Sequence, residues 1–517
     1  MGARGALGAV LVLVAVVYAP VTSAWFCGYD DFHDLARAAY EFAPAPARVF
    51  TQPQGDGLRY RPLHPGTILA TWKVAGLDAR VYRVRNVAFH LASVALVYAL
   101  GVMLLGARAP AAVAAGLFGL HPLANQAVNG AVWTNTMAWA LALAGVVLAL
   151  RGLAAPARGR LAIAAGGACA LACALVYEPT AALLGLPWLA IVLGCPVARG
   201  RARWLAGTHL VVVAVAAGLR LLALPASYGV AASSVPAPAI AVRNVAVSLA
   251  APLLPLDPVL LAVVAGTPLP SEVDPARVRA WLPAGAAVAA LAGVLALAAF
   301  RAGRRRRARP LAPDERARAR DGVQVALLAG AGALLPLVLI FAVTDHPSET
   351  YLYGPCAFVM LAAVALVRGR FGARRPALCA VLALAVAASF TLATTVRNRR
   401  VLACGRVAAR IVAGLPAAAR TAGVPVVFAN APEEPRTTRY GLYGYHGVHT
   451  IGHGAMADRG VSAALQLVYG DWRRAAVVRA APTLAALCAG AAPGELRVWV
   501  HPDGRVETCG SRSASRP

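Results

Sequence analysis

Three carboxylates and an imidazole lie within five residues near the start of the chain, in the stretch Tyr29-Asp30-Asp31-Phe32-His33-Asp34. A carboxylate there could remove the proton of a hydroxyl nucleophile, or contribute to a site for a divalent metal. The plainer interpretation is a helix start, at which Asp30 or Asp31 caps the backbone and interacts favourably with the helix dipole. Asp30 and Asp31 are therefore candidate catalytic residues, and a divalent metal is a possible cofactor.

Arginines with a different chemistry follow at three positions. Arg59 and Arg61 bracket Tyr60, and Arg220 lies near the end of a long apolar run. A guanidinium binds phosphate through two parallel hydrogen bonds, so these residues are candidates to bind an anionic head group. The alternatives are an ordinary surface pair for Arg59 and Arg61, and snorkelling of Arg220 to a membrane interface.

Further polar residues stand at the ends of apolar runs and could bind a substrate. Two of them directly precede prolines, and the others belong to the stretch 345–353, which offers carboxylates beside two tyrosines. A polar turn with tyrosines at a membrane interface explains that stretch equally well. The candidate substrate-binding residues are His121, Glu178, Asp345, Glu349, Tyr351 and Tyr353.

The remaining sequence consists mainly of apolar runs that must position these side chains. The chain has 517 residues, of which 59% are hydrophobic, and its mean hydropathy is +0.65. Apolar runs of about 18 residues or more predict membrane-spanning helices. We expect about eleven such helices, several of which are short, at 5–24, 86–106, 109–121, 131–150, 161–177, 180–195, 204–224, 279–300, 322–343, 354–368 and 376–396.

Arginines and carboxylates fall on opposite sides of this predicted bundle. With the N-terminus in the cytoplasm, the cytoplasmic side carries every arginine-rich loop between the spans and about half of the basic charge, but only Asp314, Glu315 and Asp321 of the 22 acidic residues. This asymmetry follows the positive-inside rule, which explains the net charge of +27 better than binding to nucleic acid does. Residues 5–24 could instead be a cleaved signal peptide. Either way, every candidate residue named above faces the outer side.

The C-terminal part is polar enough to fold in water. A strand is expected at 424–432, and a hairpin is expected around Asp503-Gly504. On the oxidising side of the membrane, a Cys488–Cys509 disulfide is possible.

The predicted fold is thus an all-α polytopic membrane protein with a small C-terminal extracytoplasmic α/β domain. Within the bundle, one outer segment is broken by prolines and is expected to form interfacial or re-entrant helices. The predicted divisions are the first helix 1–24, the outer loop 25–85 with the acidic motif, the bundle 86–396 including the outer segment 225–278, and the α/β domain 397–517.

The order of these motifs resembles the integral-membrane glycosyltransferases of the C superfamily. The branch it resembles most comprises protein O-mannosyltransferase-like proteins that usually carry tetratricopeptide repeats. The resemblance covers about residues 5–200 and 340–400. Its matching stretches are Tyr29-Asp30-Asp31, Tyr60-Arg61-Pro62-Leu63, 80–100, 117–143, Glu178-Pro179-Thr180, 349–355 and Arg397-Asn398.

This resemblance implies transfer of a sugar from a polyprenyl-phosphate lipid, with an acceptor protein or envelope glycan as the second partner. Asp30 or Asp31 would be the general base, with inversion at the sugar carbon. Arg59, Arg61 and Arg220 would support the charge on the leaving phosphate, and Tyr351 and Tyr353 would stack on sugar or lipid.

The sequence also departs from the family. Thr350 stands where an arginine is usual, Tyr177 stands where a lysine is usual, and the repeats are replaced by the α/β tail. The expected location is the bacterial cytoplasmic membrane, with membrane lipid and no nucleic acid among the partners. A lipid transporter or flippase, or a catalytically inactive scaffold, is the alternative.

Overall fold

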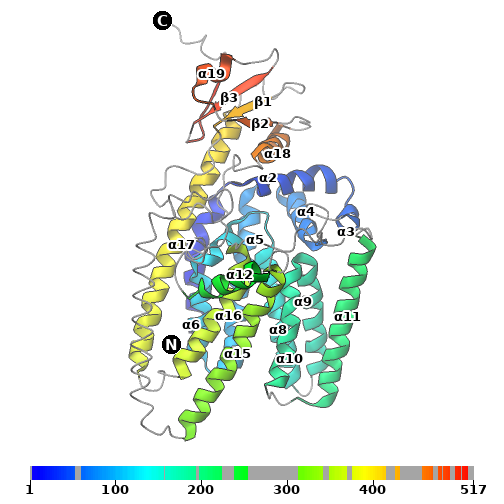
Figure 1. Cartoon of the computed structure of the whole chain (residues 1–517), viewed down its shortest axis with the longest axis vertical. Coiled ribbons are helices and arrows are strands. Elements are labelled where there is room, and N and C mark those ends of the chain that lie inside the picture. Colours follow the sequence, from blue (N-terminus) through cyan, green and yellow to red (C-terminus); the bar gives the residue numbers. More distant parts are fainter. Residues whose placement is uncertain are drawn as a thin grey trace.

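The computed structural model of the chain is a helical bundle that carries a small sheet at one end (Figure 1). It describes residues 3–52, 60–155, 158–193, 197–223, 238–253, 313–341, 349–369, 375–414, 426–430, 457–469, 476–479, 481–489, 495–501 and 503–509.

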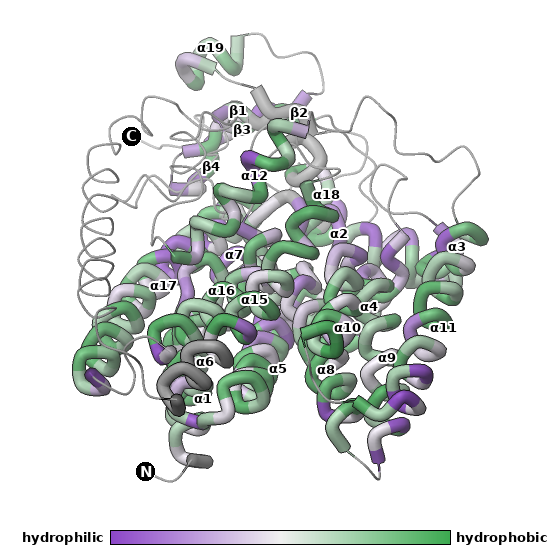
Figure 2. The backbone as a smooth tube through the Cα atoms, turned by 60° about the horizontal axis from the view of Figure 1, so that its bottom comes forward, coloured by the Kyte–Doolittle hydropathy of each residue, from purple (hydrophilic) through white to green (hydrophobic). Residues whose placement is uncertain are grey.

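Within these ranges, eight helices are long and apolar enough to cross a membrane. Figure 2 shows that hydrophobic residues dominate the helices of the bundle. A multi-pass membrane protein is therefore confirmed. The helices are α1 (Ala3–Tyr18) with its 3-10 extension η1 (Ala19–Ser23), α5 (Ala79–Leu105), α8 (Asn135–Ala154), α9 (Gly159–Val176), α11 (Arg199–Ala223), α15 (Pro313–Phe341), α16 (Glu349–Val367) and α17 (Pro376–Ala413).

The other three predicted spans are not among these eight. The span expected at 109–121 is α6 (Arg108–Leu120), whose 13 residues reach about 20 Å, less than the roughly 30 Å of a bilayer core. The span expected at 180–195 is divided into a 3-10 helix, η4 (Glu178–Leu184), and the short α10 (Gly185–Val192). The span expected at 279–300 lies outside the described residues. A total of eleven spans therefore stays a prediction.

Small residues bring two neighbouring helices of the bundle close together. A Cβ atom added to Gly145 of α8 would lie 3.1 Å from the carbonyl oxygen of Gly166 on α9. A Cβ atom added to Gly166 would lie 2.9 Å from the carbonyl oxygen of Gly145. Close contact through glycine and alanine is typical of membrane helices, where packing rather than hydrophobicity drives association. The end of α9 is held in this way beside the start of α8, where candidate residues gather.

The predicted outer loop after the first helix is largely helical. The helices α2 (Tyr29–Ala36), η2 (Arg37–Phe42, a π-helix), α3 (Arg48–Thr51) and α4 (Leu63–Ala75) lie across one end of the bundle (Figure 1). We call them the cap helices, and this end of the bundle the cap face. The outer segment is described only at 238–253, where it forms the short apolar helix α12 (Pro238–Ala250).

The C-terminal part contains a four-stranded sheet in the order β2-β1-β3-β4. The central strand β1 (Val426–Ala429) runs parallel to β2 (Ala476–Arg479) and to β3 (Leu496–Val500). The predicted hairpin is confirmed, because β3 pairs antiparallel with β4 (Val506–Thr508). Its turn includes Gly504 with φ +87°, a conformation that glycine adopts most easily.

Two further helices connect the sheet with the rest of the chain. The predicted disulfide is present and joins Cys488 of α19 (Leu484–Ala489) to Cys509, just beyond β4. Helix α18 (Ala457–Tyr469) packs on α2. The two share a hydrophobic cluster that includes Phe32, Leu35 and Leu465. The predicted boundary at 396/397 lies inside α17, which continues from the bundle towards the sheet (Figure 1).

Candidate active site

Asp31 lies at the start of α2 and holds two loops together. Its Oδ2 accepts a hydrogen bond from the backbone N–H of Cys27 at 2.9 Å, and its Oδ1 accepts one from the N–H of Val132 at 3.3 Å. The residue is 5% exposed. Burial raises the pKa of Asp31 above its usual range, and this effect outweighs the nearby charge of Arg83 and the backbone N–H groups, which favour the carboxylate.

Arg83, in the first turns of α5, is completely buried beneath this carboxylate. Its guanidinium donates to the carbonyl oxygens of Ala24 at 2.8 Å, Trp25 at 2.7 Å and Asn129 at 2.5 Å. These carbonyls belong to the same two loops that Asp31 connects. Arg83 and Asp31 therefore hold the start of α2 in place on the end of the bundle.

Asp30 differs from its neighbour in exposure. It is half-buried, whereas Asp31 is buried together with Phe32 and Leu35 on the inner side of α2. A helix turns about 100° per residue, so Asp34, four positions on, shares the outer side with Asp30. Of the two predicted catalytic carboxylates, Asp30 is thus the one that faces outwards from the cap face.

A chain of three polar side chains connects α2, α4 and α8. His64 Nε2 lies 3.5 Å from Asp34 Oδ2, and His64 Nδ1 lies 2.7 Å from Thr134 Oγ1. Burial alone would raise the pKa of Asp34. The hydrogen bond and charge of His64, with smaller contributions from His33 and Arg37, bring the pKa below its usual range. Asp34 is therefore held as a carboxylate on the outer side of α2.

Arg61 and Arg220 meet at one carboxylate on the cap face. Arg61 Nε lies 2.5 Å from Glu178 Oε2, and Arg220 Nη1 lies 3.8 Å from Glu178 Oε1. The guanidinium of Arg61 also covers the ring of Tyr177, 4.8 Å from its centre. All three charged side chains keep exposed surface, 20% for Arg61, 33% for Glu178 and 43% for Arg220. The structure thus brings together three residues that the sequence predicts for donor and substrate binding.

Glu349 lies deeper and forms a buried ion pair. Arg397 Nη1 lies 2.8 Å from Glu349 Oε1 and 3.0 Å from Oε2, and it also donates to the carbonyl oxygen of Pro122 at 2.5 Å. The two side chains are 4% and 1% exposed. The pair therefore connects α16, α17 and the end of α6 inside the protein.

His121 is also buried, between α6 and the outer segment. Its Nδ1 accepts from the N–H of Leu123 at 3.1 Å, so the proton is on Nε2, which donates to the carbonyl oxygen of Pro252 at 3.1 Å. The centre of its ring lies 4.3 Å from the centre of the Phe390 ring. Both ring nitrogens thus have partners within the protein.

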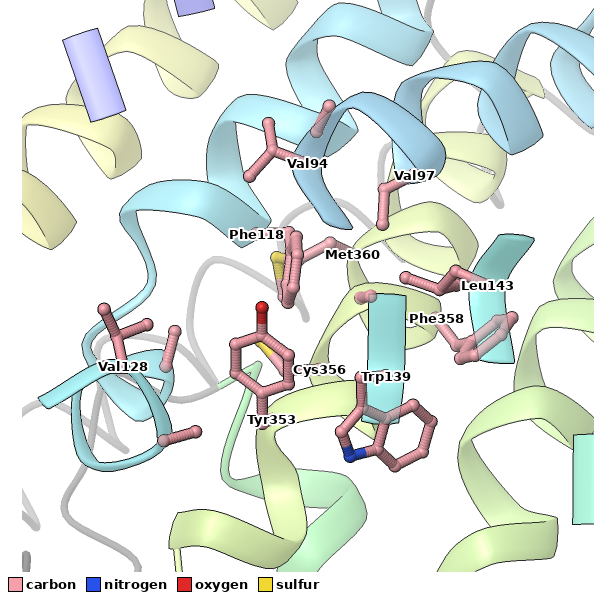
Figure 3. Close-up of a cluster of buried hydrophobic side chains, with 14 of the residues drawn as sticks. Val94, Val97, Phe118, Val128, Trp139, Leu143, Tyr353, Cys356, Phe358 and Met360 are labelled. Atoms are coloured by element: carbon pink, nitrogen blue, oxygen red, sulfur yellow. The ribbon is translucent and has the colours of Figure 1, made fainter. Parts of the chain in front are cut away.

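The two candidate tyrosines lie in different surroundings. Tyr353 is fully buried in the bundle core, where it packs beside Phe118 (Figure 3) and its hydroxyl lies 2.8 Å from His90 Nδ1. No face of its ring is open to a ligand. Tyr351 is half-buried beside Phe341, at 6.3 Å between ring centres.

Two candidates, Arg59 and Asp345, lie outside the described residues. Among the residues that are described, no group of three or more His, Cys, Asp or Glu side chains is placed to hold a metal ion. The possible divalent metal stays a prediction.

Sequence reasoning did not assign a role to Arg83, His64 or the side chain of Arg397. Arg83 stands in a stretch with Arg80 and Arg85 that hydropathy assigns to a loop. The partners of these residues come from distant segments and have no local sequence pattern.

Comparison with known proteins gives matches only at the level of structure. No protein-family model matches the sequence, and no curated protein matches it. The crystal structure of ArnT from Cupriavidus metallidurans in the apo state is similar to this chain (15% identity, TM-score 0.44, covering 97% of this chain and 94% of that chain). The form bound to undecaprenyl phosphate is similar to the same degree (15% identity, TM-score 0.47, covering 96% and 93%). Similarity this low does not establish a shared activity.

Proposed function

We propose that this chain is a membrane glycosyltransferase that moves a sugar from a polyprenyl-phosphate donor to an acceptor protein or envelope glycan at the outer face of the cytoplasmic membrane. One observation carries the proposal. The carboxylates of α2 and an arginine suited to binding phosphate meet at the start of α4. There His64 contacts Asp34 of α2, and Arg61, three residues earlier, contacts Glu178. The motif order along the sequence, with its resemblance to C-superfamily glycosyltransferases, supports the same function.

In this proposal the two carboxylates of α2 have different tasks. Asp30 is the general base and takes the proton of the acceptor hydroxyl while that oxygen attacks the sugar carbon. The bond from the same carbon to the phosphate oxygen breaks on the opposite side, which inverts the configuration. Asp31, whose oxygens accept backbone hydrogen bonds, is a positioning residue that holds the start of α2.

The leaving group is a lipid phosphate, so negative charge develops on its oxygens. Arg61 and Arg220 would stabilise that charge as fixed hydrogen-bond donors. Glu178 holds the two guanidiniums near each other before the lipid arrives, which reduces the cost of assembling two like charges in one place.

The test compares Asp30→Asn with Asp31→Asn in liposomes that contain radiolabelled polyprenyl-phosphate sugars. Loss of a general base typically costs about 10²- to 10⁴-fold in rate, so Asp30→Asn should lose at least about 100-fold while its thermal unfolding stays near that of the wild type. Asp31→Asn should lose both activity and thermal stability. Glu41→Gln is the matched control, because Glu41 is a cap-helix carboxylate that pairs with Arg37 instead.

Two outcomes would contradict the proposal in different ways. If Asp30→Asn transfers sugar at the wild-type rate, the base is assigned to the wrong residue. If the wild type transfers no sugar from any donor but moves labelled lipid between leaflets, the chain is a transporter or flippase. A wild type with neither activity would favour the scaffold.

A further inference from the structure

His64 has surroundings that suit a group which gains and loses a proton. Its two ring nitrogens face a carboxylate, Asp34, and a hydroxyl, that of Thr134. A hydroxyl can donate or accept. When the ring is neutral with its proton on Nε2, Thr134 donates to Nδ1; when the ring is charged, Nδ1–H donates to Thr134. Both protonation states of His64 therefore keep their hydrogen bonds without movement of the backbone.

The contact of His64 with Asp34 is longer than a tight hydrogen bond. The Nε2–Oδ2 distance is 3.5 Å, compared with the roughly 2.7–3.2 Å of a normal N–H···O bond. A protonated Nε2 can therefore still reach another acceptor. The side chain of His64 is 23% exposed, so such an acceptor could approach from the cap face.

Among the described residues, the charged groups that face this ring come from α2. From α2, Asp34 faces His64, and His33 and Arg37 act on that carboxylate. From α8 the ring meets only the uncharged hydroxyl of Thr134, which is 2% exposed.

The cation site described above lies in the adjacent turn. The backbone N–H of His64 donates to the carbonyl oxygen of Arg61 at 2.9 Å. The side chain of Arg61 is paired with Glu178. Leu63, between them, packs in one cluster with Tyr177. His64 thus contacts Asp34 of α2 through its ring and follows Arg61 by one turn of the backbone.

We propose that protonated His64 is a third cation of the phosphate site, and that it makes binding of the lipid phosphate depend on pH. This inference rests on the proposed function, because it adds a residue to the site that would hold the leaving phosphate. Unlike a guanidinium, an imidazole is a side chain that can gain or lose its charge at physiological pH. A phosphate group near the ring would favour the imidazolium, and the imidazolium would in turn favour the phosphate.

The direct test follows the imidazole of His64 by NMR in detergent micelles, using protein labelled at histidine. Undecaprenyl phosphate should raise the pKa of His64 by about 1, the lower end of the effect of one nearby opposite charge. Undecaprenol, which has the same chain without the phosphate, should leave it unchanged. Asp34→Asn should keep this phosphate-dependent change, because the phosphate rather than Asp34 is the anion that causes it.

Affinity for undecaprenyl phosphate gives the second readout. A pKa change of about 1 on binding corresponds to a loss of up to about tenfold in affinity as pH rises through the titration of the ring. His64→Gln should remove this part of the pH dependence and leave only the part that comes from the phosphate's own titration. His501→Gln is the matched control, since His501 also pairs with a carboxylate, Glu507, at 2.9 Å but lies in the C-terminal hairpin.

The outcomes separate this inference from the proposed function. It is wrong if undecaprenol moves the pKa of His64 as much as the phosphate does, or if His64→Gln keeps the wild-type pH dependence of binding. Should His64→Gln fail to fold, the shift expected in Asp34→Asn decides in its place. A phosphate-dependent shift without any sugar transfer would support the cation role and refute the transferase. Sugar transfer without a phosphate-dependent shift would support the transferase and refute the cation role of His64.

Discussion

Replacing Arg83 by methionine should weaken the whole cap face. The substitution keeps most of the aliphatic side chain and removes the guanidinium that donates to the carbonyl oxygens of Ala24, Trp25 and Asn129. Because Arg83 is completely buried, water cannot replace these donors without opening the structure. The carboxylate of Asp31 also loses its nearby cation.

The magnitude follows from the number of groups left without a partner. A buried acceptor that loses its hydrogen bond costs about 1–3 kcal/mol. Three carbonyl oxygens, taken at the lower limit, give about 3 kcal/mol of lost stability, before the effect on Asp31 is added. Since Arg83 lowers the pKa of Asp31, its removal should raise that pKa further.

The assay is thermal unfolding of the purified protein in detergent, with Arg80→Met as the control. Arg80 lies three residues earlier on α5 and is exposed, so the same change of side chain there should leave the unfolding temperature nearly unchanged. The double variant Asp31→Asn/Arg83→Met should lose less stability than the sum of the single variants, because the two residues interact. If Arg83→Met unfolds at the temperature of the wild type, or if the two losses add fully, the assignment of Arg83 as the support of this face is refuted.

Two further predictions concern the interior of the bundle. Arg397→Met should cost about 3–5 kcal/mol, because it removes the cation beside the buried Glu349 carboxylate. The double variant Glu349→Gln/Arg397→Met should recover part of the loss in the same unfolding assay, and no recovery would contradict the ion-pair assignment. Tyr353→Phe should cost only about 1 kcal/mol, for the lost hydrogen bond to His90, and should leave sugar transfer and affinity for the donor unchanged; a large rise in KM would instead support the stacking role predicted from the sequence.

The membrane spans show what hydropathy can and cannot predict. Apolar runs identified the long helices, but the predicted start of α5, at residue 86, is seven residues later than the observed Ala79. Arg80, Arg83 and Arg85 made this part look like a loop. In the folded protein, Asp78 caps the helix through the N–H of Arg80 at 3.0 Å. Arg83 can be buried because loop carbonyl oxygens accept the hydrogen bonds of its guanidinium.

Short helices were harder to recognise for a different reason. The apolar run at 109–121 was already as short as α6, with 13 residues, whereas the run at 180–195 did not show that the α-helix within it, α10, has only 8 residues. Their lengths depend on where the chain turns, at His121-Pro122 for α6 and at Glu178-Pro179 before α10. Since proline removes a backbone donor, it ends or interrupts a helix. These turns place His121 and Glu178 at the ends of their helices.

The difference in burial between Asp30 and Asp31 was, in contrast, partly visible in the local sequence pattern. Phe32, Leu35 and Ala36 form an apolar stripe at helical spacing, and all three are buried. A helix that buries this stripe turns residues 30 and 34 outwards and leaves residues 31 and 33 at the two edges of the stripe. The pattern therefore predicts that Asp30 is the more accessible carboxylate, but it does not show that Asp31 rather than His33 is the buried residue. The partners of Asp31 could not be found in this way, because Val132 and Arg83 reach it only through the packing of α5 and α8 against the first helix.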